Sequence, residues 1–199
     1  MKGEYEMQQG KIITLSGISG IGKSFLKSYI LENNSDFQSL VSVTTRNKRK
    51  HEVEGIDKFF YSLEEFEKEN RSGNLCVVNE VFGNWYAYKK SQIELCGCGI
   101  NLITELFYKN VCEFKAEFAN VLSIYVLPVD IERTKSELQL RNLESSDLTR
   151  RIEDIDDELA FFYNNRNLFD IVITNDYTEN TCLLLQRLIS EKIRSVQNV

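Results

Sequence analysis

The stretch GISGIGKS, residues 17–24, follows the short apolar run KIITL and leads into SFLKSYILEN. It fits Gly-x-x-x-x-Gly-Lys-Ser, the pattern of a phosphate-binding loop that joins a buried strand to a helix. Its glycines permit positive φ angles and close approach of the backbone, so several N–H groups can converge on a polyphosphate. The pattern therefore predicts a P-loop that binds a nucleoside triphosphate, with a strand before it and a helix after it.

The polar side chains of this loop have expected partners. Lys23 would reach the β- and γ-phosphates, and the Ser24 hydroxyl would hold Mg²⁺. The helix N-terminus adds partial positive charge at the same place. The other positions expected to bind the donor phosphates are Gly17, Ser19, Gly20, Ile21 and Gly22. The alternative is a glycine-rich turn with an incidental Lys-Ser pair, and the strand-and-helix context disfavours it. The motif indicates a nucleoside triphosphate and Mg²⁺ but does not identify the acceptor.

The bulk composition is that of an ordinary globular chain. The 199 residues are 42% hydrophobic and 27% charged, which suits one domain with small insertions. A net charge of −6 argues against a nucleic-acid-binding surface, which needs a basic stripe. The sequence has no apolar run of the roughly 18 residues that a membrane span needs, so no membrane contact is expected. The start MKGEYEMQQGK has no apolar signal core, so we expect a cytoplasmic protein.

The five cysteines are scattered and odd in number, which does not suggest a disulfide framework. Cys96 and Cys98 form a Cys-x-Cys pair, which could belong to a metal site or simply end a helix before Gly99. We favour the helix end, because there is no second pair and His51 is the single histidine.

Strand and helix patterns alternate along the chain, which predicts an α/β fold with a parallel sheet. Apolar runs at 100–104, 121–126 and 170–174 are typical of buried parallel strands. Short strands between 58 and 88 predict a smaller and more antiparallel insertion. The remaining strands are expected at 11–16 and 40–44, and helices at 24–33, 62–70, 91–97, 108–117, 130–141, 148–164 and 178–194.

Two helices are predicted to open on capping boxes, Ser62 with Glu65 and Ser91 with Glu94. The polar segment NLESSDLT, residues 142–149, lies between two expected helices and is a candidate lid.

A basic stretch, SVTTRNKRKHEVEGIDKFF at 42–60, is the second candidate site. Arg46 and Arg49 lie three residues apart, near Ser42. Guanidinium groups bind phosphate oxygens bidentately, so the stretch could hold an acceptor that itself carries phosphate. The alternative is a solvated basic face or a basic run that resembles a nuclear localisation signal. A phosphorylated acceptor is the more economical interpretation in an acidic chain that already binds polyphosphate.

Several of these motifs occur together in the order and spacing of the guanylate kinase family. They are GISGIGKS, the basic stretch, EVFGNWYAY, YVLPVD, RRIEDIDDEL and FDIVITND, from about residue 11 to 176. The sequence resembles this family, and the resemblance implies a P-loop core with a parallel sheet flanked by helices. The core would comprise 11–45, 98–140 and 150–199, with a monophosphate-binding insertion at about 46–97 and a short lid at about 141–149. The implied reaction is ATP plus GMP giving ADP plus GDP, with Mg²⁺.

The resemblance also implies roles for single residues. Ser42, Arg46, Arg49 and Tyr86 would bind the acceptor phosphate, and Glu105 would lie beside the base. Arg151, with Arg141 as a second, would be lid arginines on the triphosphate, and a ligand-free lid should hold Arg151 away from the phosphate site. The adenine of ATP would lie near Asn175 and Asp176.

Four residues depart from the family pattern. Lys58 replaces a phosphate-binding tyrosine and could still bind phosphate as a point charge. Val77 and Tyr88 replace a glutamate and a small hydroxyl residue that read guanine, and Phe107 replaces an aspartate near the nucleotide and metal. Unpaired buried N–H groups cost roughly 1–3 kcal/mol each. We therefore expect the phosphate contacts to survive and the preference for guanine to weaken.

Two alternatives to a GMP kinase stay open. One is a kinase acting on another nucleotide or on a sugar phosphate such as a ribose phosphate. The other is a non-catalytic module that binds phosphopeptides, which the intact Gly22-Lys23-Ser24 disfavours. The sequence is compatible with a monomer or a homodimer.

Overall fold

The computed structural model describes residues 9–81, 83–139 and 145–195. The chain divides into two compact units. The first comprises Met1–Ile12, Ser35–Thr104 and Glu113–Val121, and the second comprises Ile13–Asn34, Glu105–Cys112 and Leu122–Val199. The phosphate-binding loop belongs to the second unit and the basic stretch to the first.

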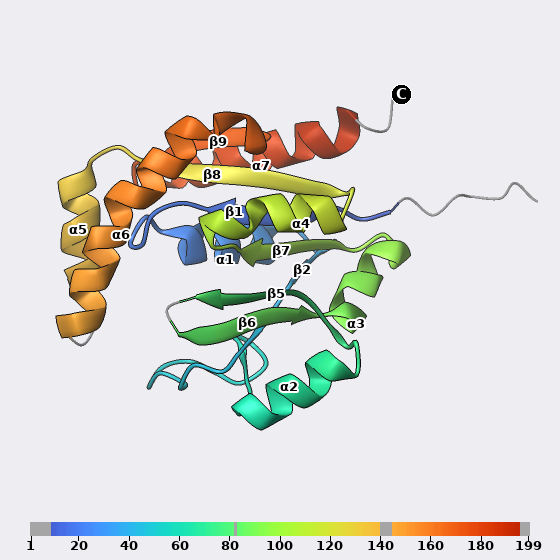
Figure 1. Ribbon diagram of the computed structural model, residues 1–199. Coiled ribbons are helices and arrows are strands. Elements are labelled where there is room, and N and C mark those ends of the chain that lie inside the picture. Colours follow the sequence, from blue (N-terminus) through green and yellow to red (C-terminus); the bar gives the residue numbers. More distant parts are fainter. Residues whose placement is uncertain (1–8, 82, 140–144, 196–199) are drawn as a thin grey trace, which may run out of the picture. The chain divides into compact units, whose positions relative to one another are not determined.

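The second unit is built on parallel strands in the order β1-β8-β9, with β1 at Ile12–Ser16, β8 at Val121–Pro128 and β9 at Ile171–Asn175. β8 and β9 run side by side and parallel, with Ile124 opposite Ile171 (Figure 1). Every residue of β1 is buried, as expected for a strand covered on both faces. These strands coincide closely with apolar runs in the sequence.

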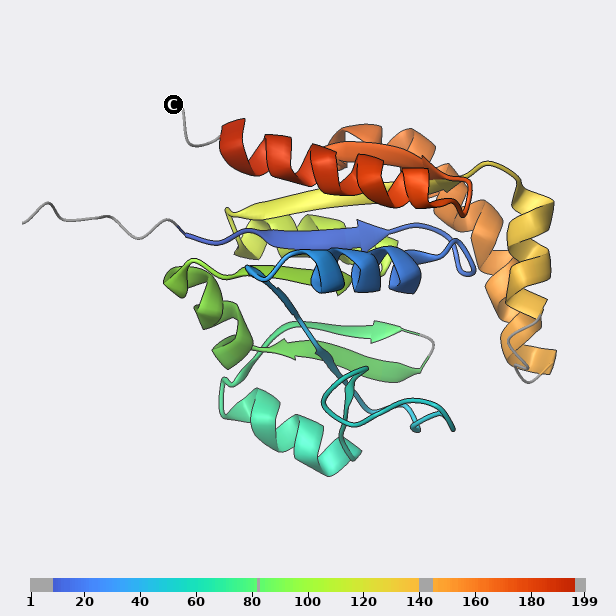
Figure 2. The same cartoon turned by 180° about the vertical axis from the view of Figure 1, so that it is seen from behind.

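Helices flank these strands. They are α1 at Lys23–Asn33, α5 at Ile131–Gln139, α6 at Ser145–Asn164 and α7 at Glu179–Ser195. α1 packs against α7, as Figure 2 shows, and α5 packs against α6. Buried residues follow helical spacing, for example Leu26 and Ile30 on α1 and Leu185 and Ile189 on α7. Tyr108–Asn110 forms a 3₁₀ turn that leads into α4 at Val111–Glu117.

The first unit contains a four-stranded sheet in the order β4-β3-β6-β5. Its strands are β3 at Ser42–Thr44, β4 at Phe59–Phe60, β5 at Leu75–Val81 and β6 at Asn84–Lys89. β6 pairs antiparallel with both β3 and β5, as the short strands predict. Phe66 of α2, Leu63–Arg71, packs with Val43, Leu75 and Ala87 to form the local core.

The strand expected at 40–44 covers only 42–44 in the structure, and a separate strand lies just before Leu40. β2, Phe37–Ser39, pairs parallel with β7, Asn101–Glu105, whereas β3 pairs with β4 and β6. Leu40 and Val41 lie at the change of sheet and belong to neither strand, and their buried apolar side chains led to their inclusion in the expected strand.

One predicted capping box is confirmed and the other is wrong. Ser62 Oγ accepts the Glu65 N–H at 3.2 Å, and the Glu65 carboxylate accepts the Ser62 N–H at 2.7 Å. Ser91 instead lies inside α3, Lys90–Ile93, because β6 runs directly into the helix and makes Lys89 its N-cap. A 3₁₀ helix, Glu94–Cys98, follows.

The segment expected to form a lid is partly helical, because α6 begins at Ser145. Residues 140–144, including the expected lid residue Arg141, lie outside the described residues.

Candidate active site

The backbone of the P-loop explains its glycines. Gly17 has φ 143° and Gly22 has φ 87°, values that other residues rarely adopt. A Cβ on Gly17 would lie 2.5 Å from the carbonyl oxygen of Val126, and one on Gly22 would lie 2.8 Å from Nδ2 of Asn175. The loop therefore has no room for side chains at these positions.

Lys23 is the first residue of α1 and folds back over the loop. Its ammonium donates hydrogen bonds to the carbonyl oxygens of Gly17 and Ile18, the second at 3.1 Å. Ser24 follows in the exposed first turn of the helix. The expected phosphate-binding ammonium and the hydroxyl next to it thus lie at one helix N-terminus, where partial positive charge favours anions.

Residues after β9 fasten the loop from behind. The buried amide of Asn175 donates to the carbonyl oxygen of Ile21 at 2.7 Å. Asp176 accepts hydrogen bonds from Thr178 and Thr181 at 2.7 Å each. These bonds lower the pKa of Asp176 to about 2. Asn175 therefore supports the loop, and Asp176 organises the turn into α7.

Tyr177 is a loop contact that the sequence did not single out. Its hydroxyl donates to the carbonyl oxygen of Gly20 at 3.2 Å and lies 3.1 Å from Thr134 Oγ1. Its φ of 63° is rare for a residue with a side chain. The guanidinium of Arg133 lies 4.5 Å from the centre of its ring. Nothing in the sequence around Tyr177, which follows Asn-Asp, indicates that its hydroxyl contacts the P-loop.

α6 contacts the P-loop through Arg151. Arg151 Nη1 donates to Ser19 Oγ at 3.2 Å, so this expected lid arginine touches the loop. The expectation that Arg151 stays away from the phosphates until both substrates bind stays a prediction.

Two turns further along α6, Glu158 is only 5% exposed. Burial raises the pKa of its carboxyl to about 7, while the charge of Lys23 and the N–H of Gly17 act in the opposite direction. Sequence reasoning missed Glu158. The signal was available, because it interrupts an apolar stripe of Ile155, Leu159 and Phe162 at helical spacing.

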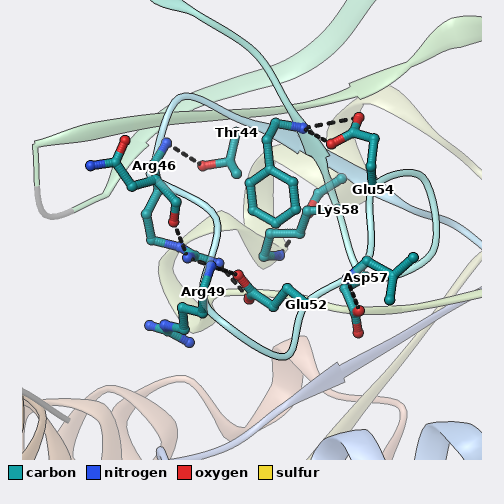
Figure 3. Close-up of polar contacts among 11 residues, drawn as sticks. Thr44, Arg46, Arg49, Glu52, Glu54, Asp57 and Lys58 are labelled. Carbon is teal, nitrogen blue, oxygen red and sulfur yellow. Dashed lines mark hydrogen bonds and ion pairs between the residues drawn. The ribbon is translucent and has the colours of Figure 1, made fainter.

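In the first unit, Arg46 is held by a carboxylate. Its Nη2 and Nη1 donate to the two oxygens of Glu52 at 2.6 and 3.0 Å, which makes a bidentate pair (Figure 3). Nη1 also donates to the carbonyl oxygen of Asn47 at 2.6 Å. Although burial opposes it, this pairing raises the pKa of Arg46 and lowers that of Glu52.

The same glutamate connects the two arginines. Glu52 Oε2 accepts the backbone N–H of Arg49 at 2.7 Å, while the side chain of Arg49 extends away from the carboxylate (Figure 3). Glu54 accepts the N–H of Phe60 with both oxygens, at 3.1 and 3.3 Å, and Asp57 accepts that of Val53 at 2.7 Å. Three carboxylates therefore fix the backbone of this loop.

Further expected acceptor residues gather beside this loop. Lys58, just before β4, donates from Nζ to Ser42 Oγ of β3 at 2.9 Å. The same Nζ lies 5.7 Å from the ring centre of Tyr86 on β6, and Tyr86 contributes to the raised pKa of Arg46. The first unit thus brings together Ser42 of β3, Tyr86 of β6, and Arg46 and Lys58 of the connection between β3 and β4.

Two of the departures from the family pattern lie in β5 and β6. Val77 has φ 48° at an irregularity in the pairing of β5 with β6, and its N–H donates to Glu117 Oε2 at 3.3 Å. Tyr88 is 5% exposed, packs edge-on against Phe114 with ring centres 5.3 Å apart, and lies within 3.2 Å of Thr104 Oγ1. The tyrosine hydroxyl is therefore already engaged inside the first unit.

Glu105 and Phe107 follow in the second unit. Glu105 is the last residue of β7 and is half-buried, and the ring of Phe107 lies 4.6 Å from that of Tyr108. Within the described ranges, no cluster of three or more His, Cys, Asp or Glu side chains could hold a metal ion. No helix of the described part is long and apolar enough to cross a membrane.

Comparison with known proteins matches this geometry to one family. The family model described as guanylate kinase matches residues 9–192. The chain belongs to the guanylate kinase family. It is 31% identical to the guanylate kinase of Mesomycoplasma hyopneumoniae strain J, over 95% of this chain and 98% of the relative. It is 35% identical to that of Mycoplasmoides gallisepticum, over 92% and 93%.

A solved structure agrees. The crystal structure of guanylate kinase from Anaplasma phagocytophilum superimposes with a TM-score of 0.75 at 25% identity, covering 93% of this chain and 87% of that one. The mixed α/β fold with a parallel central sheet and flanking helices is that of the guanylate kinase family. The protein is thus an enzyme of the nucleoside monophosphate kinase class, with ATP as phosphate donor and nucleotides as substrates.

Proposed function

We propose that this guanylate kinase family member transfers the γ-phosphoryl group of ATP to GMP, giving ADP and GDP. The observation that carries the proposal is the pairing of two anion sites in one chain. The second unit supplies a P-loop with Lys23 on its carbonyls, and the first supplies an arginine pair fixed by Glu52. Family membership supports GMP as the acceptor, because the relatives described above are guanylate kinases.

Such a transfer asks little covalent chemistry of the protein. An oxygen of the GMP phosphate attacks the γ-phosphorus, the bond to the β,γ-bridging oxygen breaks, and ADP leaves with that oxygen. Lys23 and Arg151 would neutralise charge on the donor phosphates, and Arg46, Arg49 and Lys58 would hold the acceptor phosphate. Positioning and charge stabilisation are therefore the main contributions of these side chains.

Mg²⁺ fits the residues that are present. The exposed Ser24 hydroxyl lies at the start of α1, and magnesium in such enzymes takes most of its other ligands from phosphates and water. A site of this kind needs no cluster of acidic side chains. When bound, the ion neutralises charge that develops between the β- and γ-phosphates.

Recognition of the base is the part of the proposal in which the residues depart from the family pattern. Val77 and Tyr88 offer guanine no carboxylate and no accessible hydroxyl, since the Tyr88 hydroxyl faces Thr104. Glu105 remains as a carboxylate that could accept a base N–H. We infer that GMP is bound chiefly through its phosphate and that its advantage over other monophosphates is small.

Neither alternative acceptor gains a supporting observation. The relatives described above are guanylate kinases, not sugar-phosphate kinases. A module that only binds phosphopeptides would not need a complete P-loop. Two further expectations, a cytoplasmic location and a monomeric or homodimeric state, stay predictions.

An assay of ADP release tests the proposal. The purified protein, with ATP and Mg²⁺, is given GMP, dGMP, AMP, CMP, UMP, IMP or ribose phosphates in turn. We expect turnover with GMP at a rate typical of kinases, about 1–100 s⁻¹. Turnover of a ribose phosphate without turnover of GMP would replace the proposed acceptor, and absence of any acceptor-dependent ADP release would remove the enzyme assignment.

A further inference from the structure

Tyr177 has a backbone conformation that a residue with a side chain rarely adopts. It lies just after β9 with φ 63°, and it is one of two residues other than glycine that have a positive φ in the described part of the chain. Such a conformation is unfavourable and persists only where surrounding contacts compensate it, often beside a functional site. The contacts that hold Tyr177 therefore bear on function.

The first of these contacts fixes the turn after β9. The N–H of Tyr177 donates to Oδ1 of Asn175 at 2.9 Å, and the amide of the same asparagine donates to the carbonyl oxygen of Ile21 at 2.7 Å. Asparagine side chains that accept the N–H two residues further on stabilise tight turns. One buried asparagine thus binds the P-loop and also holds Tyr177 in its strained conformation.

The tyrosine side chain lies between the P-loop and α5. Its hydroxyl donates to the carbonyl oxygen of Gly20 at 3.2 Å and lies 3.1 Å from Oγ1 of Thr134 on α5. The guanidinium of Arg133, on the same helix, lies 4.5 Å from the ring centre. A Cβ on Gly22 would lie 3.6 Å from Cε1 of the tyrosine. The ring is therefore held by α5, and its edge lies against the loop.

Two successive carbonyl groups of the P-loop are held from behind in this way. Tyr177 holds that of Gly20, and Asn175 holds that of Ile21. In a planar trans peptide, the N–H of the following residue points away from the carbonyl oxygen. The N–H of Ile21 donates to a carbonyl within the loop, and the N–H of Gly22 is directed away from Asn175. The two side chains thereby set the orientation of the loop's peptide groups.

We propose that Tyr177 is a positioning residue for the donor phosphates and that Thr134 acts through it. The tyrosine hydroxyl holds the carbonyl of Gly20 away from the ligand side of the loop, so that N–H groups of the loop and of the α1 N-terminus face the triphosphate. The inference rests on the proposed function in taking the P-loop as the donor site, but it does not depend on GMP as the acceptor.

Binding to the whole protein tests it without turnover. Titration calorimetry compares Tyr177→Phe with the parent, using ATP or inorganic tripolyphosphate in excess Mg²⁺. Phenylalanine keeps a ring next to Arg133 and removes only the hydroxyl. We expect Tyr177→Phe to bind both ligands about 3- to 10-fold more weakly, the equivalent of one hydrogen bond. Weaker binding of ATP alone would overturn the proposal, because Tyr177 would then contact the base.

Tyr125→Phe is the matched control. The Tyr125 hydroxyl is buried in the same unit and also donates to a backbone carbonyl, that of Glu158 at 3.5 Å, but it makes no hydrogen bond to the P-loop in the described structure. Both variants should melt at a lower temperature than the parent, and Tyr125→Phe should keep the parent's affinity for both ligands. A purely structural role predicts unchanged affinity in Tyr177→Phe as well, and equal losses in both variants would show that affinity merely follows stability; either result overturns the proposal.

Steady-state kinetics should show the same selectivity. In Tyr177→Phe, KM for ATP should rise by the factor found in the titration, while KM for GMP stays within about twofold of the parent value. An equal rise in both KM values would contradict a role confined to the donor site. A parent that binds ATP without turnover of GMP would refute the proposed function and leave the binding result standing.

Thr134→Val tests the link to α5, because valine has nearly the shape of threonine without its hydroxyl. The change should weaken ATP and tripolyphosphate binding about 2- to 5-fold in the parent and have no further effect in Tyr177→Phe. The Thr134 hydroxyl also donates to the carbonyl oxygen of Asp130 at 3.0 Å, and loss of that bond should lower the melting temperature equally in both backgrounds. Additive losses of affinity in the double variant would overturn the action of Thr134 through Tyr177.

Discussion

Two glutamates next to two site cations behave in opposite ways. Glu52 forms a bidentate pair with Arg46 in the first unit, and the charge of Lys23 acts on the buried Glu158 in the second. The pKa of Glu52 is lowered, whereas burial raises that of Glu158 to about 7. The Glu52 side chain keeps 17% exposure and has Arg46 and the Arg49 N–H as direct donors, but Glu158 is 5% exposed.

The difference shows that a neighbouring cation does not by itself decide the state of a carboxylate. Short bonds to a forked guanidinium favour the charged form and exceed the modest desolvation of Glu52. Lys23 divides its donors between two backbone carbonyls, so it compensates the deeper burial of Glu158 less completely. The acceptor-side loop is therefore held by a firm ion pair, whereas burial leaves the Glu158 carboxyl with a pKa of about 7.

Replacement of Lys23 should have the largest effect on kcat, and it tests whether the P-loop is the donor site. Lys23→Ala deletes the charge that follows the migrating phosphoryl group, so kcat should fall by about 10²–10³ or more. Steady-state kinetics of ADP release with saturating ATP and GMP measure it. A variant as fast as the parent would mean that the loop is not the donor site.

The pH dependence of stability should sharpen the comparison. The pKa values of the two glutamates are shifted in opposite directions, so their contributions to stability change with pH in opposite senses. The raised pKa of Glu158 contributes stability below its ordinary value of 4.5, and this is lost as pH rises through about 7. Relative to Glu158→Gln, the parent should lose up to roughly 3 kcal/mol between those limits. The titratable groups that interact with this carboxyl are Lys23, Asp154, Tyr108 and Tyr125.

For Glu52 the slope reverses. Its lowered pKa contributes stability above 4.5 that is lost as pH falls through the lowered value. Relative to Glu52→Gln, the parent should therefore gain stability on going from acid to neutral pH. Urea unfolding of the parent and both variants, from about pH 4 to about pH 8, measures both differences. Slopes of equal sign would show that pairing and burial do not separate the two sites.

A change in Glu52 should weaken the binding of the acceptor, GMP, and leave the binding of the donor, ATP, unchanged. Glu52→Gln weakens the fork on Arg46 and the bond to the Arg49 N–H, so the arginines are no longer fixed. A lost charge-assisted bond is worth about 1.5–3 kcal/mol, so KM for GMP should rise about 10- to 100-fold while KM for ATP stays within about twofold.

Glu54→Gln is the matched control for this loop. Glu54 also accepts a backbone N–H, that of Phe60, but it makes no ion pair with Arg46 in the described structure. Its replacement should leave KM for GMP within about threefold of the parent value, since one neutral bond is worth about 1 kcal/mol at most when an amide oxygen can replace it. A similar increase in both variants would attribute the effect to loop stability and not to the arginines.

The sequence predicted much of this structure because the decisive patterns are local. The order of strands and helices follows from apolar periodicity, and the P-loop from glycines whose φ angles the structure confirms. The change of sheet at Leu40 and Val41 could not be predicted, since the short strand before them has no apolar run of its own and pairing with β7 is a long-range contact. Nor could Ser91 be excluded as a cap, because that depended on β6 running directly into the helix.

The parts of the site that escaped prediction depend on long-range contacts. Glu158 lies 135 positions from Lys23 along the chain, and only folding brings its carboxyl under the influence of that charge. Tyr177 contacts the P-loop by its hydroxyl in a backbone conformation that its sequence neighbours do not announce. Glu52 was visible as a residue after the two arginines, but its simultaneous bonds to a side chain and a backbone N–H were not.

The smallest expected effect concerns Tyr88, which tests whether the first unit reads the base as well as it holds the phosphate. Tyr88→Phe removes a hydroxyl that lies 3.2 Å from Thr104 Oγ1 in a buried position and keeps the ring against Phe114. The free energy of unfolding should fall by about 1 kcal/mol, since Thr104 loses a partner. The ratio of kcat/KM for GMP to that for AMP should stay within about twofold, because a hydroxyl already engaged inside the protein cannot also serve guanine. Parallel kinetics with both monophosphates and urea unfolding decide this point. A selective loss of GMP turnover, with unfolding unchanged, would mean that Tyr88 turns its hydroxyl to the base and that the weak guanine preference inferred above is wrong.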